Sequence, residues 1–92
     1  MPTNTFKNLT SSGIVIPGEG TLEGMYVNST SSGILRLFNS PSAGTDTGKV
    51  IGGIMTPAAG YHYLGDIHAT AGIYCGVQSG TINVTFHIRN ID

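Results

Sequence analysis

The sequence predicts an all-β domain of about eight short antiparallel strands, arranged as a β-sandwich or a jelly roll. Apolar residues come in short runs, and clusters of Gly, Pro, Asn and Ser separate these runs. No ten-residue stretch has the three-and-four spacing of apolar residues that an amphipathic helix needs. Short strands with turns at regular intervals are typical of sandwiches, jelly rolls and small barrels.

The expected strands follow one another along the whole chain. The first seven cover residues 6–9, 13–16, 21–27, 34–38, 50–56, 61–64 and 71–77. Clusters of residues that tolerate turn dihedrals separate most of them, at 17–20, 28–33, 39–44, 57–60 and 78–80. The clearest strand is the eighth, residues 81–89. Side chains two positions apart share a face of a strand, so Ile82, Val84, Phe86 and Ile88 are expected to be buried there.

The domain organisation expected from the sequence is one all-β domain, residues 13–92, preceded by a polar N-terminal arm, residues 1–12. A chain of 92 residues supports one modest core. The arm is suited to reach a neighbouring molecule, since chain termini are loosely ordered unless they are tied down. No apolar run approaches the roughly 20 residues of a membrane-spanning helix. No secretory h-region follows Met1, so we expect a chain that stays in the cytoplasm where it is made.

The composition indicates an exterior that is polar but nearly uncharged. Only 10% of the residues are charged, whereas Gly, Ser and Thr supply 33 of the 92 positions. Charged residues are depleted where neighbouring subunits cover a surface, so this composition favours a component of an assembly. Charge-poor surfaces rich in Thr also occur on free-standing lectin-like sandwiches. The net charge of −1 and the scattered basic residues exclude the electrostatic footprint of a nucleic-acid-binding protein.

Motifs that would carry catalysis or metal binding fail on spacing or context. Residues 44–50 resemble a phosphate-binding loop, but three residues separate the glycines and Val50 follows the lysine. His62 and His68 flank Asp66 without a recognised metal-ligand spacing. Cys75 lies inside an expected strand, where a core position is the better interpretation. We therefore expect no enzyme activity, no cofactor and no metal.

Exposed aromatic side chains are the strongest candidates for a binding role. Tyr61 and Tyr63 alternate on a strand and so share a face, and tyrosines placed in this way form either a protein interface or a platform for sugars. His87 and Arg89 lie on the polar face of the last strand. The candidate partner-binding residues are therefore Phe6, Tyr61, Tyr63, His87 and Arg89.

Several segments together resemble small all-β proteins of tailed bacteriophages, the class that includes capsid decoration (cement) proteins. These segments are Gly20-Thr21-Leu22 followed by Gly24, Tyr26-Val27-Asn28-Ser29-Thr30-Ser31-Ser32-Gly33-Ile34-Leu35 followed by Leu37, Ala43-Gly44-Thr45, Pro57-Ala58-Ala59-Gly60, Ala71-Gly72-Ile73-Tyr74 and Gly80-Thr81-Ile82-Asn83-Val84-Thr85-Phe86. The resemblance implies a homotrimer that sits on the outside of a phage head and stabilises it by bridging capsid subunits. It implies further copies of the chain and the major capsid protein as partners. The expected location is the virion, assembled in the cytoplasm of the bacterial host.

Two other functions remain open at this point. A carbohydrate-binding module would use Tyr61, Tyr63 and His62, although the chain has no Trp and no acidic cluster for calcium. A tail-fibre or spike component is expected to contain longer intertwined repeats or a coiled-coil segment, and the sequence contains neither.

Overall fold

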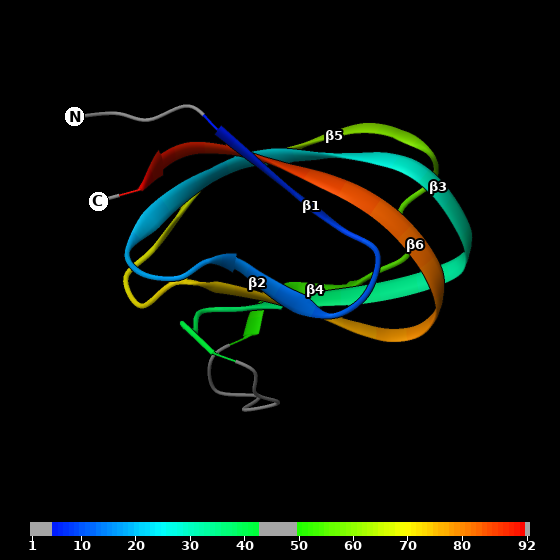
Figure 1. The fold of residues 1–92 in the computed structure, drawn as a ribbon, viewed down its shortest axis with the longest axis horizontal. Coiled ribbons are helices and arrows are strands. Elements are labelled where there is room, and N and C mark those ends of the chain that lie inside the picture. Colours follow the sequence, from blue (N-terminus) through cyan, green and yellow to red (C-terminus); the bar gives the residue numbers. More distant parts are fainter. Residues whose placement is uncertain (1–4, 43–49, 92) are drawn as a thin grey trace.

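The computed structural model describes residues 5–42 and 50–91, which form six β-strands (Figure 1). In chain order they are β1 (Thr5–Leu9), β2 (Gly13–Ile16), β3 (Gly20–Phe38), β4 (Val50–Met55), β5 (Gly60–Ala69) and β6 (Ile73–Ile91). Every pairing between them is antiparallel. The prediction of an antiparallel all-β fold is confirmed. None of the described residues belongs to a helix with the length and apolar character needed to cross a bilayer.

Two long strands, β3 and β6, pair along their whole length and form a curved ribbon at the centre of the fold. The pairing runs from Gly20 opposite Ile91 to Phe38 opposite Tyr74. The prediction of turns at 28–33 and 78–80 is therefore wrong. The four strands predicted on either side of these segments, 21–27, 34–38, 71–77 and 81–89, are two long strands, β3 and β6. The ribbon contains register shifts, including one between Ser31 and Ile34, and the strands pair on both sides of each shift. Such bulges bend the strands, so the ribbon can curve without losing its pairing.

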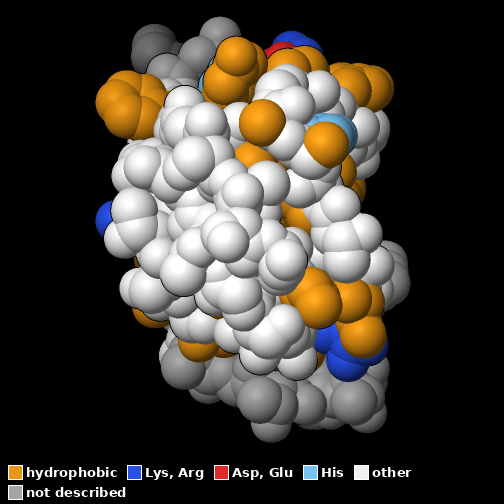
Figure 2. All heavy atoms as spheres, turned by 90° about the vertical axis from the view of Figure 1, so that its right-hand side faces the viewer, with side chains coloured by type: hydrophobic (Ala, Val, Ile, Leu, Met, Phe, Trp, Pro, Cys, Tyr) orange, Lys and Arg blue, Asp and Glu red, His pale blue; other side chains and the backbone are white. Residues whose placement is uncertain are grey.

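The bend of the ribbon depends on Gly80. This residue has a φ of 71°, and a Cβ added to it would lie 2.1 Å from the carbonyl oxygen of Ser32 on the facing strand. Ser32 itself has a φ of 53°. Only glycine adopts the left-handed region without a steric penalty, so Gly80 allows the two backbones to approach closely where the ribbon turns. Figure 2 faces these bends and shows a surface that is mostly polar and uncharged in its middle.

The shorter strands extend the two halves of the ribbon separately. β1 pairs with the last part of β6 and β5 with the first part of β3, while β2 pairs with the first part of β6 and β4 with the last part of β3. The ribbon curves back on itself, so the two halves lie as layers on either side of the interior (Figure 1). Among the described strands no pairing joins β1 to β2 or β4 to β5, so the sheet is not closed.

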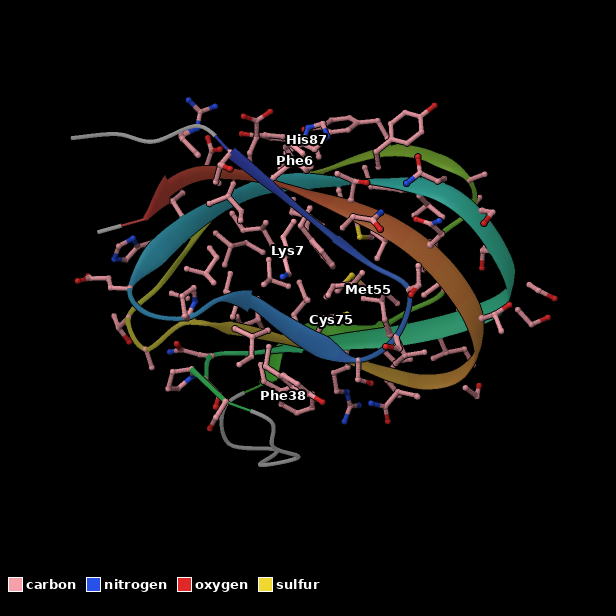
Figure 3. All side chains as sticks on the ribbon, viewed as in Figure 1. Phe6, Lys7, Phe38, Met55, Cys75 and His87 are labelled. Atoms are coloured by element: carbon pink, nitrogen blue, oxygen red, sulfur yellow. The ribbon has the colours of Figure 1, made fainter. Side chains whose placement is uncertain are left out.

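The core lies between the two layers and follows the alternation expected for the last strand. Ile82, Val84, Phe86 and Ile88 are each at most 4% exposed. Burying a side chain of this size stabilises the fold by about 1.5–3 kcal/mol. The residues between them consequently point to the outer face. Cys75 also lies between the layers, whereas Phe6 and His87 point away from them (Figure 3).

The segment expected as an N-terminal arm contributes a strand to the sheet. Residues 5–9 form β1, which pairs with β6 from Thr5 opposite Ile88 to Leu9 opposite Val84. Residues 1–4 lie outside the described residues. The part of the segment that the structure describes is therefore tied down by backbone hydrogen bonds rather than held out toward a neighbour.

Candidate binding surface

The five residues proposed from the sequence as partner contacts lie on one surface, the outer face of the layer formed by β1, β5 and the adjoining halves of β3 and β6. Phe6 comes from β1, Tyr61 and Tyr63 from β5, and His87 and Arg89 from β6. Two carboxylates join them, Glu23 of β3 and Asp66 of β5. We call these seven residues the outer-face cluster. It includes the two most exposed large hydrophobic side chains of the described residues, Phe6 at 68% and Tyr63 at 62%.

Arg89 is the centre of a hydrogen-bond network that joins three strands. Its Nε donates to Asp66 Oδ1 at 3.0 Å and its Nη2 donates to Glu23 Oε1 at 3.2 Å. The second oxygen of each carboxylate accepts a tyrosine hydroxyl, Glu23 Oε2 from Tyr61 and Asp66 Oδ2 from Tyr63, both at 3.1 Å. Both ion pairs are exposed and screened by solvent, so they contribute little to stability. The main consequence of the network is that it fixes the orientation of both tyrosines.

The electrostatic effect of the network is to keep its donors protonated. Partial desolvation and the hydrogen bond to Glu23 raise the pKa of Tyr61. The hydrogen bond to Asp66 raises the pKa of Tyr63, and the same carboxylate raises the pKa of Arg89. Tyrosines with a raised pKa remain neutral hydrogen-bond donors at physiological pH, which suits binding rather than proton abstraction.

Asp66 reaches the cluster because β5 bulges beside it. Leu22 pairs with Ile67 and Gly24 with Tyr63, so three residues of β5 lie opposite one residue of β3. Within this bulge Gly65 and Asp66 have φ values of 85° and 55°. Aspartate tolerates the left-handed region better than most residues, and bulges commonly redirect a side chain.

Gly24 makes room for the ring of Tyr61. A Cβ at this position would lie 2.6 Å from the Tyr61 hydroxyl oxygen and 2.6 Å from the backbone oxygen of His62. The absence of a side chain on Gly24 thus lets the phenol lie against the backbone of β3 and reach Glu23. The centroid of the Tyr61 ring lies 5.4 Å from that of the His87 ring, with an angle of 42° between their planes.

A hollow of about 580 Å³ lies beside these aromatic rings. It is lined by Thr5, Phe6, Glu23, Thr85, His87 and Ile88. Phe6 and His87 are register partners on adjacent strands, and both point away from the core (Figure 3). The size of the hollow falls in the range of small-molecule sites, about 300–1,000 Å³, although this hollow is open to solvent.

A ladder of uncharged polar side chains continues the same face toward the bends. Asn8 Nδ2 donates to Asn83 Oδ1 at 2.8 Å and to Thr85 Oγ1 at 3.0 Å. Asn28 Nδ2 donates to the same two oxygens, at 3.2 and 3.1 Å respectively. The ladder thus connects β1, β6 and β3 through contacts between their side chains.

Other residues considered from the sequence do not join the cluster. His62 contacts the backbone oxygen of Ala58 at 2.7 Å, whereas His68 contacts Glu19 at 2.8 Å, so the two histidines make separate contacts. Within residues 5–42 and 50–91, no group of three His, Cys, Asp or Glu side chains is placed to hold a metal ion. Most of the loop resembling a phosphate-binding motif, residues 44–50, lies outside the described residues.

Cys75 is buried, and burial raises the pKa of its thiol to about 12. Such a thiol is protonated at neutral pH and therefore a poor nucleophile.

Comparisons with known proteins give this chain no relative: no protein-family model, no curated protein and no solved structure matches it.

Proposed function

We propose that this chain is a structural subunit of a tailed-phage virion, a homotrimeric capsid decoration protein that binds the outside of the head through the outer-face cluster. The observation that carries the proposal is the network in which Arg89 holds two exposed tyrosines through Glu23 and Asp66. Tyr and Arg are, with Trp, the residues enriched at the hot spots of protein interfaces. Side chains that are already fixed lose less entropy when a partner binds, so the network favours attachment.

We further propose that the fold is a jelly roll. Counting β3 and β6 as two segments each, divided at their bends, gives eight segments in chain order. The pairing then places the first, eighth, third and sixth segments side by side in one layer, and the second, seventh, fourth and fifth in the other. This order is that of an eight-stranded jelly roll, an architecture that occurs in viral capsid proteins.

Two properties support the trimer and the bridging role: the low charge of the surface, and the gain in affinity when several weak contacts form at once. The chain is charge-poor, and the surface over the bends is largely uncharged (Figure 2). Surfaces of this kind are suited to coverage by neighbouring copies. A trimer presents three copies of the outer-face cluster, so weak contacts with several capsid subunits reinforce one another without any reaction chemistry.

A binding role also agrees with the chemistry of the cluster. Both of its carboxylates are bonded to Arg89, and its tyrosines have a raised pKa, so neither carboxylate–tyrosine pair resembles a general base beside a nucleophile. We therefore propose no enzymatic activity and no cofactor.

Co-sedimentation with empty phage heads tests the proposal. The heads are assembled from the major capsid protein of the virus that carries this chain, without the chain itself. We expect wild-type protein to bind these heads and the double variant Tyr61→Ala/Tyr63→Ala to bind about 100-fold more weakly, because two hot-spot side chains are removed. Both tyrosines are exposed, so circular dichroism is expected to show a folded variant.

The matched control is Ile54→Ala, which removes an exposed apolar side chain from β4 in the other layer. Its affinity for the heads is expected to equal that of the wild type. Equal binding by the double variant and the control would overturn the assignment of the outer-face cluster as the attachment surface.

A further inference from the structure

The hollow beside Phe6 combines an exposed apolar ring with the polar side chains of Glu23 and Thr85. The hydrogen bonds that these two side chains already make show which donors and acceptors are left for a ligand. Its lining comes from β1, β3 and β6, which pair side by side, so the backbone fixes the relative positions of the lining residues. Phe6, Glu23 and His87 of the outer-face cluster are among its lining residues, whereas Tyr61 and Tyr63 are not.

The apolar part of the site is the ring of Phe6, which is 68% exposed. An exposed phenylalanine is unfavourable in water, and nothing among the described residues covers this one. His87 is its register partner on β6 and also lines the hollow. The centroid of the Tyr61 ring lies 5.4 Å from that of the His87 ring. A flat ligand with an apolar face can therefore lie against Phe6 while its edge meets His87.

Among the polar lining residues, Glu23 provides an acceptor and Thr85 a donor. Each Glu23 oxygen accepts one hydrogen bond within the network, from Arg89 or Tyr61, which leaves further lone pairs for a ligand hydroxyl. The amides of Asn8 and Asn28 both lie within hydrogen-bond distance of Thr85 Oγ1 as donors, so the hydrogen of the Thr85 hydroxyl is left to donate. A ligand hydroxyl both donates and accepts hydrogen bonds, and this pair of groups matches it.

The charge around the hollow selects a neutral ligand. Among the residues that the structure describes, no Lys or Arg side chain lines the hollow, so it offers a phosphate or carboxylate ligand no cation to pair with. A cationic ligand would gain little from Glu23, because Arg89 already pairs with it at 3.2 Å. An apolar ring face together with neutral hydroxyl groups is the chemistry of a saccharide.

We propose that the hollow lined by Phe6, Glu23, Thr85 and His87 binds a neutral pyranose ring. The C–H face of the sugar stacks on Phe6, and its hydroxyls donate to Glu23 and accept from Thr85. The site differs from the Tyr61, Tyr63 and His62 combination suggested by the sequence, because His62 contacts Ala58 rather than the outer-face cluster. Phe6, Glu23 and His87 also belong to the outer-face cluster, so a bound sugar would occupy part of the surface proposed for attachment to the head.

The test is a titration of the full 92-residue chain with methyl glycosides of neutral hexoses and of N-acetylglucosamine, followed by amide chemical shifts in NMR spectra. We expect saturable shifts at residues 5, 6, 23, 85, 87 and 88, with a Kd on the order of 1 mM for a shallow site that holds one ring. Phe6→Ala is expected to weaken binding about tenfold, whereas Phe6→Tyr, which keeps the aromatic face, is expected to retain it. Ile54→Ala is the control and is expected to bind as the wild type.

Three results would overturn the proposal. The first is the absence of shifts with every neutral glycoside at tens of millimolar. The second is binding that Phe6→Ala leaves unchanged. The third is a response at these residues to inorganic phosphate or to tetramethylammonium alone, which would assign the hollow to a charged ligand. No phage heads enter this experiment, so its failure is distinguishable from a failure of the attachment role.

Discussion

Gly24→Ala is the substitution that tests the construction of the outer-face cluster most sharply. A Cβ at this position lies 2.6 Å from the hydroxyl oxygen of Tyr61 and 2.6 Å from the backbone oxygen of His62, whereas ordinary contact begins at 3.4 Å. The phenol can swing outward, but the His62 carbonyl belongs to β5 and moves only if the pairing of β3 with β5 moves. Overpacking of this kind costs about 1–3 kcal/mol of unfolding free energy. The same displacement removes the hydrogen bond from Tyr61 to Glu23.

Two measurements follow the effect of Gly24→Ala. Urea denaturation monitored by circular dichroism is expected to show the loss of unfolding free energy, and the pKa of Tyr61, followed by NMR, is expected to fall back toward 10. The control is Gly18→Ala, since a Cβ on Gly18 meets nothing within 4 Å. Its effect is expected to stay within about 0.5 kcal/mol. If Gly24→Ala behaves like Gly18→Ala in both measurements, the described fit of Tyr61 against β3 is incorrect.

Three further predictions concern the bend, the tyrosines and the cysteine. Gly80→Ala is expected to lower the unfolding free energy by more than about 1 kcal/mol, because φ is 71° and the added Cβ meets Ser32; a neutral effect in urea denaturation would refute this account of the bend. The pKa values of Tyr61 and Tyr63 are raised above 10 in the folded state, so the stability they contribute is complete below pH 10 and is lost as the pH rises through the folded values. An ultraviolet titration in which both tyrosines ionise at pH 10 would contradict this. The Cys75 thiol, with a pKa of about 12, is expected to resist a disulfide reagent at about pH 8 until urea unfolds the chain, and rapid reaction of the native protein would argue against its burial.

Local alternation in the sequence predicts which face of a strand is buried, and the last strand demonstrates this. Apolar residues at every second position of 82–88 are buried as expected. The bounds of β2, residues 13–16, are also those predicted. By contrast, the Gly- and Ser-rich segments 28–33 and 78–80 permit either a turn or a bulged bend. Both segments form bulged bends because β3 and β6 pair on either side of them. These strands are distant in the sequence, so local propensity does not predict their pairing.

The candidate surface could be predicted only in part, for a similar reason. Alternation places Tyr61 beside Tyr63 and His87 beside Arg89, but strand pairing is what brings the two pairs together. In the sequence, Asp66 is a candidate only beside His62 and His68, and nothing in the sequence links Glu23 or Asp66 to Arg89; strand pairing brings both carboxylates to it. The Gly65-Asp66 dipeptide was the available signal, since both residues tolerate the left-handed backbone of a bulge.

The measurement that tests the assembly role most directly is the mass of the purified chain in solution, determined by light scattering over a series of concentrations. A homotrimeric decoration protein is expected to have a constant mass of three times 9.5 kDa. A mass of 9.5 kDa at every concentration would contradict the trimer and, with it, the bridging of capsid subunits by a multivalent clamp.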